Sequence, residues 1–260
     1  VVGDVAWLER QASRTTKPWF VGARQCMTTS GFRSLISTTL QRMKQEAHFI
    51  DLDGFIRFHN SYTAYTVWMF QTAIAGRVAK DLLLVPDDID PELGVSSIRD
   101  KDSERPYHAR LIWVLEGVRQ QLAFYRSHRN QVVAELKLRG ISCGDEPGFY
   151  LSSTMRHQPP SAKLMLESLS LPAKVPANAH RRYMRTELVE RGCPVETVDA
   201  MLGHWALGEE PWASESTFDV SRHLETLRRY VPPLMSELGW QVVPSPLVFG
   251  YRRRWQCRPI

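Results

Sequence analysis

Residues 60–76, NSYTAYTVWMFQTAIAG, constrain the fold most, because a helix that is apolar on most of its faces must be surrounded by other elements. Asn60 and Ser61 are residue types favoured at a helix start, and Gly76 suits a helix end. We therefore expect a buried helix over this range, with the remaining elements packed around it.

Further helices are predicted by apolar residues that recur with a spacing of three and four. Residues 94–100 and 109–115 read as two strands joined by the polar link KDSERPYH, as in a hairpin. The fold class that follows is mainly α with a small antiparallel β-sheet (α+β). The predicted helices cover 31–47, 116–139, a patch at 161–169, 179–191, 194–202, and 219–230, the last ending before Pro232-Pro233.

Composition restricts the class of protein. The chain of 260 residues contains no run of about 18 apolar residues and no signal-peptide pattern, so we expect no membrane partner. The net charge of +5 is compatible with a polyanionic partner. The cysteines show no C-x-x-C spacing, which argues against a zinc site and favours a reducing cytoplasm; they are Cys26, Cys143, Cys193 and Cys257.

Basic residues and one histidine occur in four segments in a fixed order. In that order, the segments resemble the catalytic domain of the tyrosine recombinase (phage integrase) family, over roughly residues 50–240. The segments are AIAGRVAKDLLLVPDDID (73–90) with Arg77, IRDKDSERPYHARLIWV (98–114) with Lys101, NAHRRYMRTELVERG (178–192) with Arg181, and VDAMLGH (198–204) with His204.

The resemblance implies chemistry on a DNA phosphodiester. Charge builds on the non-bridging oxygens when a hydroxyl attacks, and the guanidiniums of Arg77 and Arg181 offer planar paired donors to those oxygens. Lys101 would protonate the leaving 5′ oxygen, and His204 would assist by accepting a proton or binding a phosphate oxygen. The family uses no metal, and no cofactor is expected.

Each of these residues also has a structural interpretation. Arg77 could cap a helix C-terminus, where a cation is favoured, and Lys101 could be one charge of a solvated turn. Gly203-His204 could be a helix stop with a buried histidine. Arg181 and Arg182 could be exposed charges of a first helical turn, but cations are disfavoured at a helix start, which suggests an anion nearby. The aromatic run HNSYTAYTVWMF could stack bases, but its spacing favours the core.

Two departures from the family pattern bear on activity. Asn178 stands where the family usually has His, and no Tyr follows His204 within 205–220. Phe218 then holds the aromatic place without its hydroxyl, and the next tyrosine is Tyr230. Three explanations stay open: Phe218 is an engineered Tyr→Phe change, Tyr230 is the nucleophile in an altered or swapped arrangement, or cleavage has been lost.

The resulting hypothesis is a metal-independent site-specific recombinase that integrates DNA of phages or other mobile elements through a 3′-phosphotyrosyl intermediate. The alternative is a non-cleaving DNA-binding protein on the same fold. The partners would be duplex DNA and further copies in a synaptic tetramer, or a partner recombinase, in the bacterial nucleoid; no small-molecule substrate is expected. Residues 1–48 would be a linker or remnant of a core-binding region, and 49–260 the catalytic domain with a basic tail. Asn178, Arg182 and Arg185 would contact phosphates.

Overall fold

The computed structural model describes residues 27–49, 51–78, 83–99, 109–169, 178–205, 216–249 and 258–259. It is mainly helical with small antiparallel two-stranded sheets, which confirms the expected secondary-structure class. Its helices are α2 (Thr29–Glu46), α3 (Leu52–Ala73), α4 (Glu116–Leu138), α5 (Ala162–Leu169), α6 (Ala179–Glu190), α7 (Val195–Leu202), α8 (Val220–Glu237) and α9 (Pro246–Phe249), with a 3-10 turn at Pro86–Asp88.

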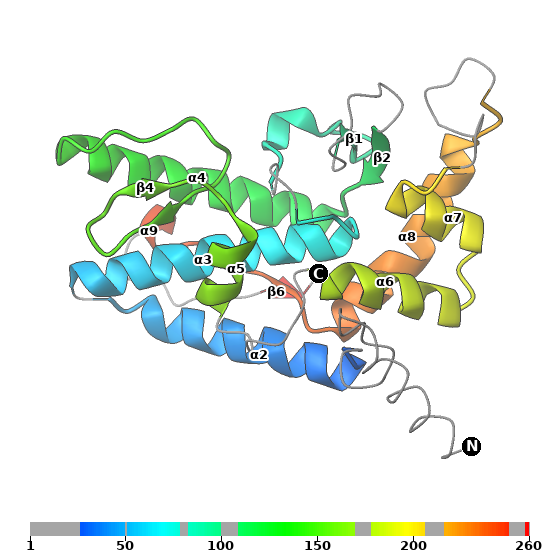
Figure 1. The fold of residues 1–260 in the computed structure, drawn as a ribbon, viewed down its shortest axis with the longest axis horizontal. Coiled ribbons are helices and arrows are strands. Elements are labelled where there is room, and N and C mark those ends of the chain that lie inside the picture. The colour runs from blue at the N-terminus through cyan, green and yellow to red at the C-terminus, as the bar shows by residue number, and fades with distance from the viewer. Residues whose placement is uncertain are drawn as a thin grey trace, which may run out of the picture.

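The central helix is α3, as its apolar faces predicted. It contacts α2, α4, α5 and α6, and every residue from Ser61 to Ala73 is buried. Figure 1 shows α3 and α4 running lengthwise together, with α6, α7 and α8 gathered at one end. The aromatic residues of the 59–70 run are among the core side chains, so the core interpretation of that run is confirmed.

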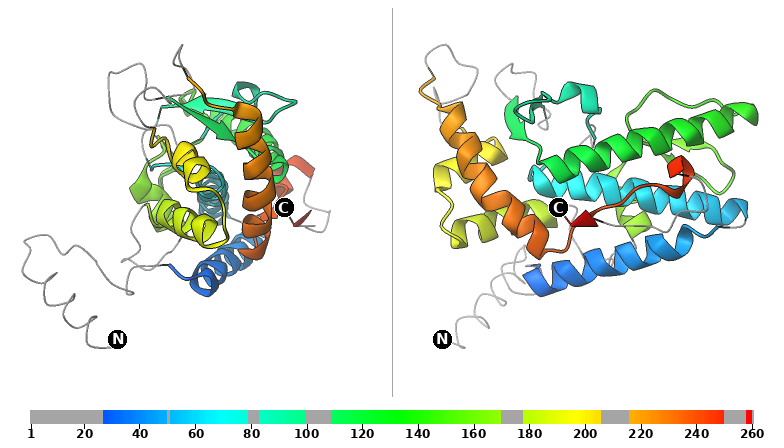
Figure 2. Two further views of the ribbon diagram at one scale, coloured as in Figure 1. Left: turned by 90° about the vertical axis from the view of Figure 1, so that its right-hand side faces the viewer. Right: turned by 180° about the vertical axis from the view of Figure 1, so that it is seen from behind.

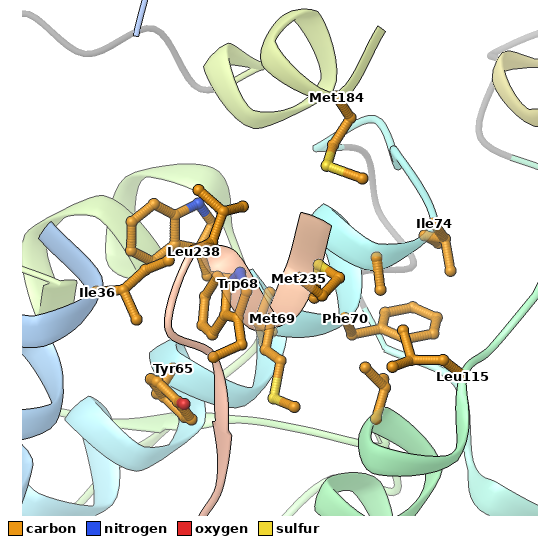
Figure 3. Packing of buried hydrophobic residues seen from close by; sticks show 14 of the residues in the cluster. Ile36, Tyr65, Trp68, Met69, Phe70, Ile74, Leu115, Met184, Met235 and Leu238 are labelled. Carbon is orange, nitrogen blue, oxygen red and sulfur yellow. The ribbon is translucent and has the colours of Figure 1, made fainter. Parts of the chain in front are cut away.

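The core continues from α3 into the C-terminal helices. Trp68, Met69 and Phe70 of α3 pack among side chains of α2, α4, α6 and α8 in one cluster, as Figure 3 shows; the labelled neighbours are Ile36, Leu115, Met184, Met235 and Leu238. Because α2 contributes to this cluster, it shares a core with α3, α6 and α8. The division of the chain at residue 48 stays a prediction.

The start of α3 was predicted wrongly. Asp51 is the N-cap, and its carboxylate accepts a hydrogen bond from the Gly54 amide, so the helix begins eight residues before Asn60. Asn60 lies inside the helix, where its amide both donates to the Leu151 carbonyl and accepts from the Leu151 amide, each at 2.8 Å. A tertiary contact with β3 therefore accounts for a residue that resembles a local cap.

The predicted hairpin is confirmed: β1 (Val95–Ile98) pairs antiparallel with β2 (Arg110–Trp113), with Ile98 opposite Arg110. The sequence did not predict two further pairs of two-residue strands. These are β3 (Tyr150–Leu151) with β4 (His157–Gln158), and β5 (Gln241–Val242) with β6 (Arg258–Pro259). Strands this short carry no period-two pattern from which they could be recognised.

We expected helix α8 to end before Pro232-Pro233. It instead continues to Glu237 with both prolines inside it. Proline removes a backbone donor and normally breaks a helix. Here Leu227, Val231, Leu234 and Met235 form one buried stripe across the proline pair, whereas Pro233 is exposed. Burial of that stripe therefore offsets the lost hydrogen bonds. Figure 2 shows the chain leaving α8 and running along α3 and α4 towards α9.

Two fully buried histidines join α3 to α4 and to the segment after α8. His59 Nε2 donates to the Phe149 carbonyl at 3.0 Å, so its neutral ring accepts at Nδ1 from His128 Nε2, also at 3.0 Å. His128 Nδ1 is then an acceptor for the Ser245 hydroxyl at 2.8 Å. Every polar atom of the two imidazole rings is paired, and both rings must be neutral for this pattern to hold.

Candidate functional site

The C-terminal end of α3 forms a tight reversal that exposes three consecutive carbonyls to other elements. Ala75, with φ of 47°, adopts the left-handed conformation that usually favours glycine, and the Gly76 amide returns to the Gln71 carbonyl at 2.8 Å. We expected glycine itself to supply the reversal. Gly76 instead allows close approach, because a Cβ there would overlap the buried Gln71 side chain.

All three carbonyls accept hydrogen bonds from basic or imidazole side chains. The carbonyl of Ile74 accepts from Arg110 Nη1 at 2.9 Å, that of Ala75 from Arg181 Nη1 at 2.6 Å, and that of Gly76 from His180 Nε2 at 3.0 Å. Carbonyls at a helix C-terminus carry partial negative charge, so they are suitable acceptors for buried cations. Arg77 follows this reversal directly and is half-buried.

The C-terminal end of α7 faces the same two arginines. Gly203, with φ of 65°, is the left-handed cap, and the His204 amide returns to the Asp199 carbonyl at 2.8 Å. The Met201 carbonyl accepts from Arg110 Nη1, and the Leu202 carbonyl accepts from Arg181 Nη2 at 2.6 Å. Two helix ends thus converge on Arg110 and Arg181, which are 1% and 8% exposed.

His204 lies at this junction and is exposed, so the alternative of a buried histidine is wrong. Its Nε2 is 3.4 Å from Arg181 Nη2, and its Nδ1 is 3.8 Å from a carboxylate oxygen of Asp199. Because a guanidinium only donates, Nε2 is the acceptor and the ring proton of the neutral form is on Nδ1, towards Asp199. His204 and Arg181 therefore present adjacent polar groups next to the residue-77 turn.

Three of the remaining candidate residues, Asn178, Arg182 and Arg185, lie at the start of α6 or on it. Asn178 precedes the helix, and its Oδ1 accepts from the Val78 amide at 3.1 Å, which ties the start of α6 to the residue after Arg77. Arg182 and Arg185 are exposed on α6. Lys101 lies outside the described residues. The structure thus gathers Arg77, Asn178, Arg181 and His204 around one junction, and their roles towards phosphate stay predictions.

Tyr230 is not part of this junction within the chain. Its hydroxyl donates to the Gly192 carbonyl at 3.0 Å, in the turn that follows α6. Arg181 is in the first turn of α6, and a helical rise of 1.5 Å per residue separates the two ends by about 15 Å. Tyr230 is half-buried and acts as a structural contact between α8 and that turn.

Phe218, by contrast, lies next to the residue that follows His204. Its ring is 4.8 Å from the Trp205 ring in an edge-on arrangement and 5.0 Å from the His223 ring. Burial lowers the pKa of His223 to about 4, so this imidazole is neutral near pH 7. The aromatic side chain near His204 is therefore one without a hydroxyl.

Sequence reasoning missed Arg110 and His180, although both carry a signal. Arg110 is a charged residue at the start of an otherwise apolar strand, where burial requires polar partners. His180 directly precedes Arg181 in the same first turn of α6 and is 1% exposed. The distinguishing information in each case is the set of carbonyls that the side chain reaches, which the sequence does not contain.

A cavity, a metal site and a membrane span are three further features for which the described part of the chain can be searched. A hollow of about 500 Å³, lined by residues such as Phe55, Glu135 and Met155, shares no residue with the junction. Within the described ranges, no three His, Cys, Asp or Glu side chains are grouped in a way that could hold a metal ion. Among the described helices, none combines the length and apolar character that a membrane span requires.

Comparison with solved structures gives a protein of similar fold. No family model and no curated protein matches the sequence. This solved structure is that of the integrase of the transposon Tn1549 in complex with a circular intermediate DNA. The TM-score is 0.43 and the sequence identity is 16%, over 86% of this chain and 76% of that chain.

Proposed function

We propose that this protein binds the phosphodiester backbone of duplex DNA at the junction of Arg77, Arg181 and His204. The observation that carries the proposal is the convergence of two helix C-termini on Arg181, which brings the residue-77 turn and His204 to one place. Hydrogen bonds to the carbonyls of Ala75 and Leu202 fix Arg181, and its Nη2 is 3.4 Å from His204 Nε2, so a guanidinium charge is held beside the exposed imidazole.

The arrangement suits phosphate because it combines fixed and exposed groups. Arg181 is held by two short hydrogen bonds and loses little freedom when it binds, whereas His204 and Arg182 are exposed beside it. A guanidinium offers paired donors to phosphate oxygens and keeps its charge at any physiological pH. The net charge of +5 adds long-range attraction to a polyanion.

The resemblance of the four sequence segments makes site-specific DNA recombination the reaction class that this scaffold would serve. In that class, a tyrosine hydroxyl forms a 3′-phosphotyrosyl link, with Lys101 as general acid and without metal or cofactor. The oligomer would be a synaptic tetramer on DNA in the bacterial nucleoid.

Cleavage by Tyr230 of the same chain does not fit the geometry, because its hydroxyl contacts Gly192 beyond the far end of α6. We therefore favour a protein that binds DNA without cutting it in this way. Phe218 near Trp205 supports this form of the proposal, since the aromatic group close to His204 has no nucleophilic oxygen. Recombination with Tyr230 supplied by a neighbouring protomer is the second candidate.

Salt-dependent binding to a duplex tests the proposal. The slope of log affinity against log salt changes by about 0.9 for each phosphate contact on duplex DNA, so Arg77→Gln should flatten the slope by about one contact. Arg57→Gln is the matched control, because Arg57 is exposed near the opposite end of α3 and the charge change is the same. If the two variants flattened the slope equally, the change would reflect only the lost charge, and the proposed phosphate contact of Arg77 would be contradicted.

A nicked suicide substrate separates the two candidate functions. We expect wild type to bind without a covalent adduct, and Phe218→Tyr to be the variant that can gain one. An adduct in wild type that disappears in Tyr230→Phe would instead establish the recombinase with Tyr230 as nucleophile. If wild type and every variant, Phe218→Tyr included, bound DNA without an adduct, the protein would be a DNA-binding protein without cleavage activity.

A further inference from the structure

Arg110 is a buried arginine that was not among the candidate site residues, although it lies within the segment 98–114. Its burial requires an explanation. It is the first residue of β2, opposite Ile98 of β1, and 1% of its surface is exposed. Placing a guanidinium in the interior is unfavourable unless hydrogen bonds compensate for the lost water. Arg110 meets that requirement with backbone carbonyls from two different helices.

The two carbonyls have equivalent positions along the chain. A single nitrogen of Arg110, Nη1, donates to the carbonyl of Ile74 at the end of α3, at 2.9 Å, and to the carbonyl of Met201 at the end of α7. Ile74 stands three residues before Arg77, and Met201 stands three residues before His204. Arg110 thus connects the two turns from which the candidate phosphate-binding side chains emerge.

Arg181 makes the same kind of connection one residue further along each turn. It joins Ala75 to Leu202, the residues that follow Ile74 and Met201. A single tie would let one helix end pivot about the other. Two ties, one residue apart on both partners, fix the rotation as well as the distance between the turns. Arg110 therefore supplies the second constraint that Arg181 by itself lacks.

Packing on Gly203 strengthens this constraint. A Cβ on Gly203 would lie 2.9 Å from Arg110 Cδ and 3.3 Å from Arg110 Cβ, so the aliphatic part of Arg110 lies directly against the backbone of the α7 cap. β2 and α7 are also in contact as elements. The side chain consequently holds the cap through its methylene groups and the carbonyl through its guanidinium.

We propose that Arg110 is a positioning residue that fixes Arg77 and His204 relative to each other, without touching the bound anion itself. The inference rests on the proposed function for its role in DNA binding, whereas the positioning of His204 is independent of any ligand. Because Arg110 is buried beneath both turns, its removal should change the arrangement of the junction and not the charge that the DNA meets directly.

Three variants test the proposal. Arg110→Met keeps length and apolar bulk but has no donor, and Arg110→Lys restores one nitrogen that can bridge both carbonyls. Arg129→Met is the matched control, because Arg129 likewise donates to two backbone carbonyls, those of Glu146 at 2.9 Å and Gly144 at 3.0 Å, away from the junction. Thermal melting of each variant checks that it is folded.

The first readout needs no DNA. The imidazole ¹⁵N resonances of His204, assigned by comparison with His204→Gln, report its contact with Arg181. They should move in Arg110→Met, return towards wild type in Arg110→Lys, and stay at wild-type values in Arg129→Met. The second readout is duplex affinity: Arg110→Met should bind about tenfold more weakly, with a salt slope flatter by about one contact, and Arg129→Met should match wild type.

The outcomes separate the two proposals. Unchanged His204 resonances in folded Arg110→Met would overturn the positioning role, whatever the DNA result. If wild type shows no salt-dependent DNA binding, the proposed function fails and the resonances alone decide on Arg110. If Arg110→Met does not fold, Arg110→Gln replaces it, since it keeps an amide donor that is too short to span both carbonyls. Equal shifts in Arg129→Met would also contradict the proposal, because they would reflect a general loss of stability.

Discussion

The hydroxyl of Tyr230, a residue of α8, and the side chain of Arg181 lie at opposite ends of α6. Arg181 is in the first turn of α6, and the Tyr230 hydroxyl bonds to the Gly192 carbonyl in the turn after its last residue, at 3.0 Å. One face of α8 thus fixes the far end of α6, while Arg181 fixes the near end to α3 and α7. The hydroxyl that the sequence offers as a nucleophile therefore serves packing within this chain.

Tyr230→Phe should accordingly affect stability and leave DNA binding unchanged. The variant loses one hydrogen bond at a half-buried position, so we expect the free energy of unfolding to fall by about 0.5–1.5 kcal/mol. Urea denaturation measures this change, and a duplex titration at fixed salt measures affinity. A large loss of affinity in the folded variant would contradict the assignment of Tyr230 to a structural contact.

Arg181→Gln should be among the most destabilising changes of a charged residue in the described chain. It leaves the Ala75 and Leu202 carbonyls without their short hydrogen bonds in a buried place, at a cost of about 3 kcal/mol or more. Arg182→Gln changes the same charge at the next, exposed position and should alter the free energy of unfolding by less than about 0.5 kcal/mol. Comparable urea midpoints for the two variants would show that Arg181 does not hold the helix ends.

Gly203→Ala should combine backbone strain with a steric clash, and Gly140→Ala isolates the strain. Both glycines have positive φ, of 65° and 73°, so alanine at either costs about 1–2 kcal/mol. A Cβ at Gly140 meets nothing within 4 Å, whereas at Gly203 it presses on Arg110 at 2.9 Å. We expect Gly203→Ala to be the more destabilising by about 1–3 kcal/mol, and to weaken DNA binding as well. Thermal unfolding of both variants gives the difference, and equal losses would rule out tight packing against Arg110.

Acid should destabilise the fold through its buried histidines. Burial lowers the pKa of His59 to about 3, and burial together with the nearby His59 holds the pKa of His128 well below its ordinary value of 6.5. The unfolded chain therefore binds protons from about pH 6.5 downward while the folded chain does not. The free energy of unfolding should consequently fall as pH drops from about 6.5 towards 3.

Urea denaturation at pH 7.5, 5.5 and 4.5 measures this slope. His48→Gln, at an exposed position on the loop after α2, should keep the slope, whereas His128→Gln should reduce it. A free energy of unfolding that stays constant over this range would contradict the neutral, fully paired arrangement of His59 and His128.

Periodicity predicted elements well where each element's own side chains decide its conformation. The helix expected over 116–139 is α4 at 116–138, and the hairpin strands are found within the predicted ranges. The predictions failed where a distant contact overrides a local preference. Asn60 pairs with Leu151 instead of capping a helix, and the stripe around Val231 keeps α8 helical through Pro232-Pro233.

The sequence by itself determined a central apolar helix, the order of the surrounding elements, and the basic residues that mark one end of the molecule. Only the tertiary structure decided how that end is held together. Every residue has a backbone carbonyl, so the sequence does not show which carbonyls will accept hydrogen bonds from a distant side chain. Whether Arg110 and Arg181 are surface charges or buried ties depends on the carbonyls at the ends of α3 and α7, and these meet only after the chain has folded.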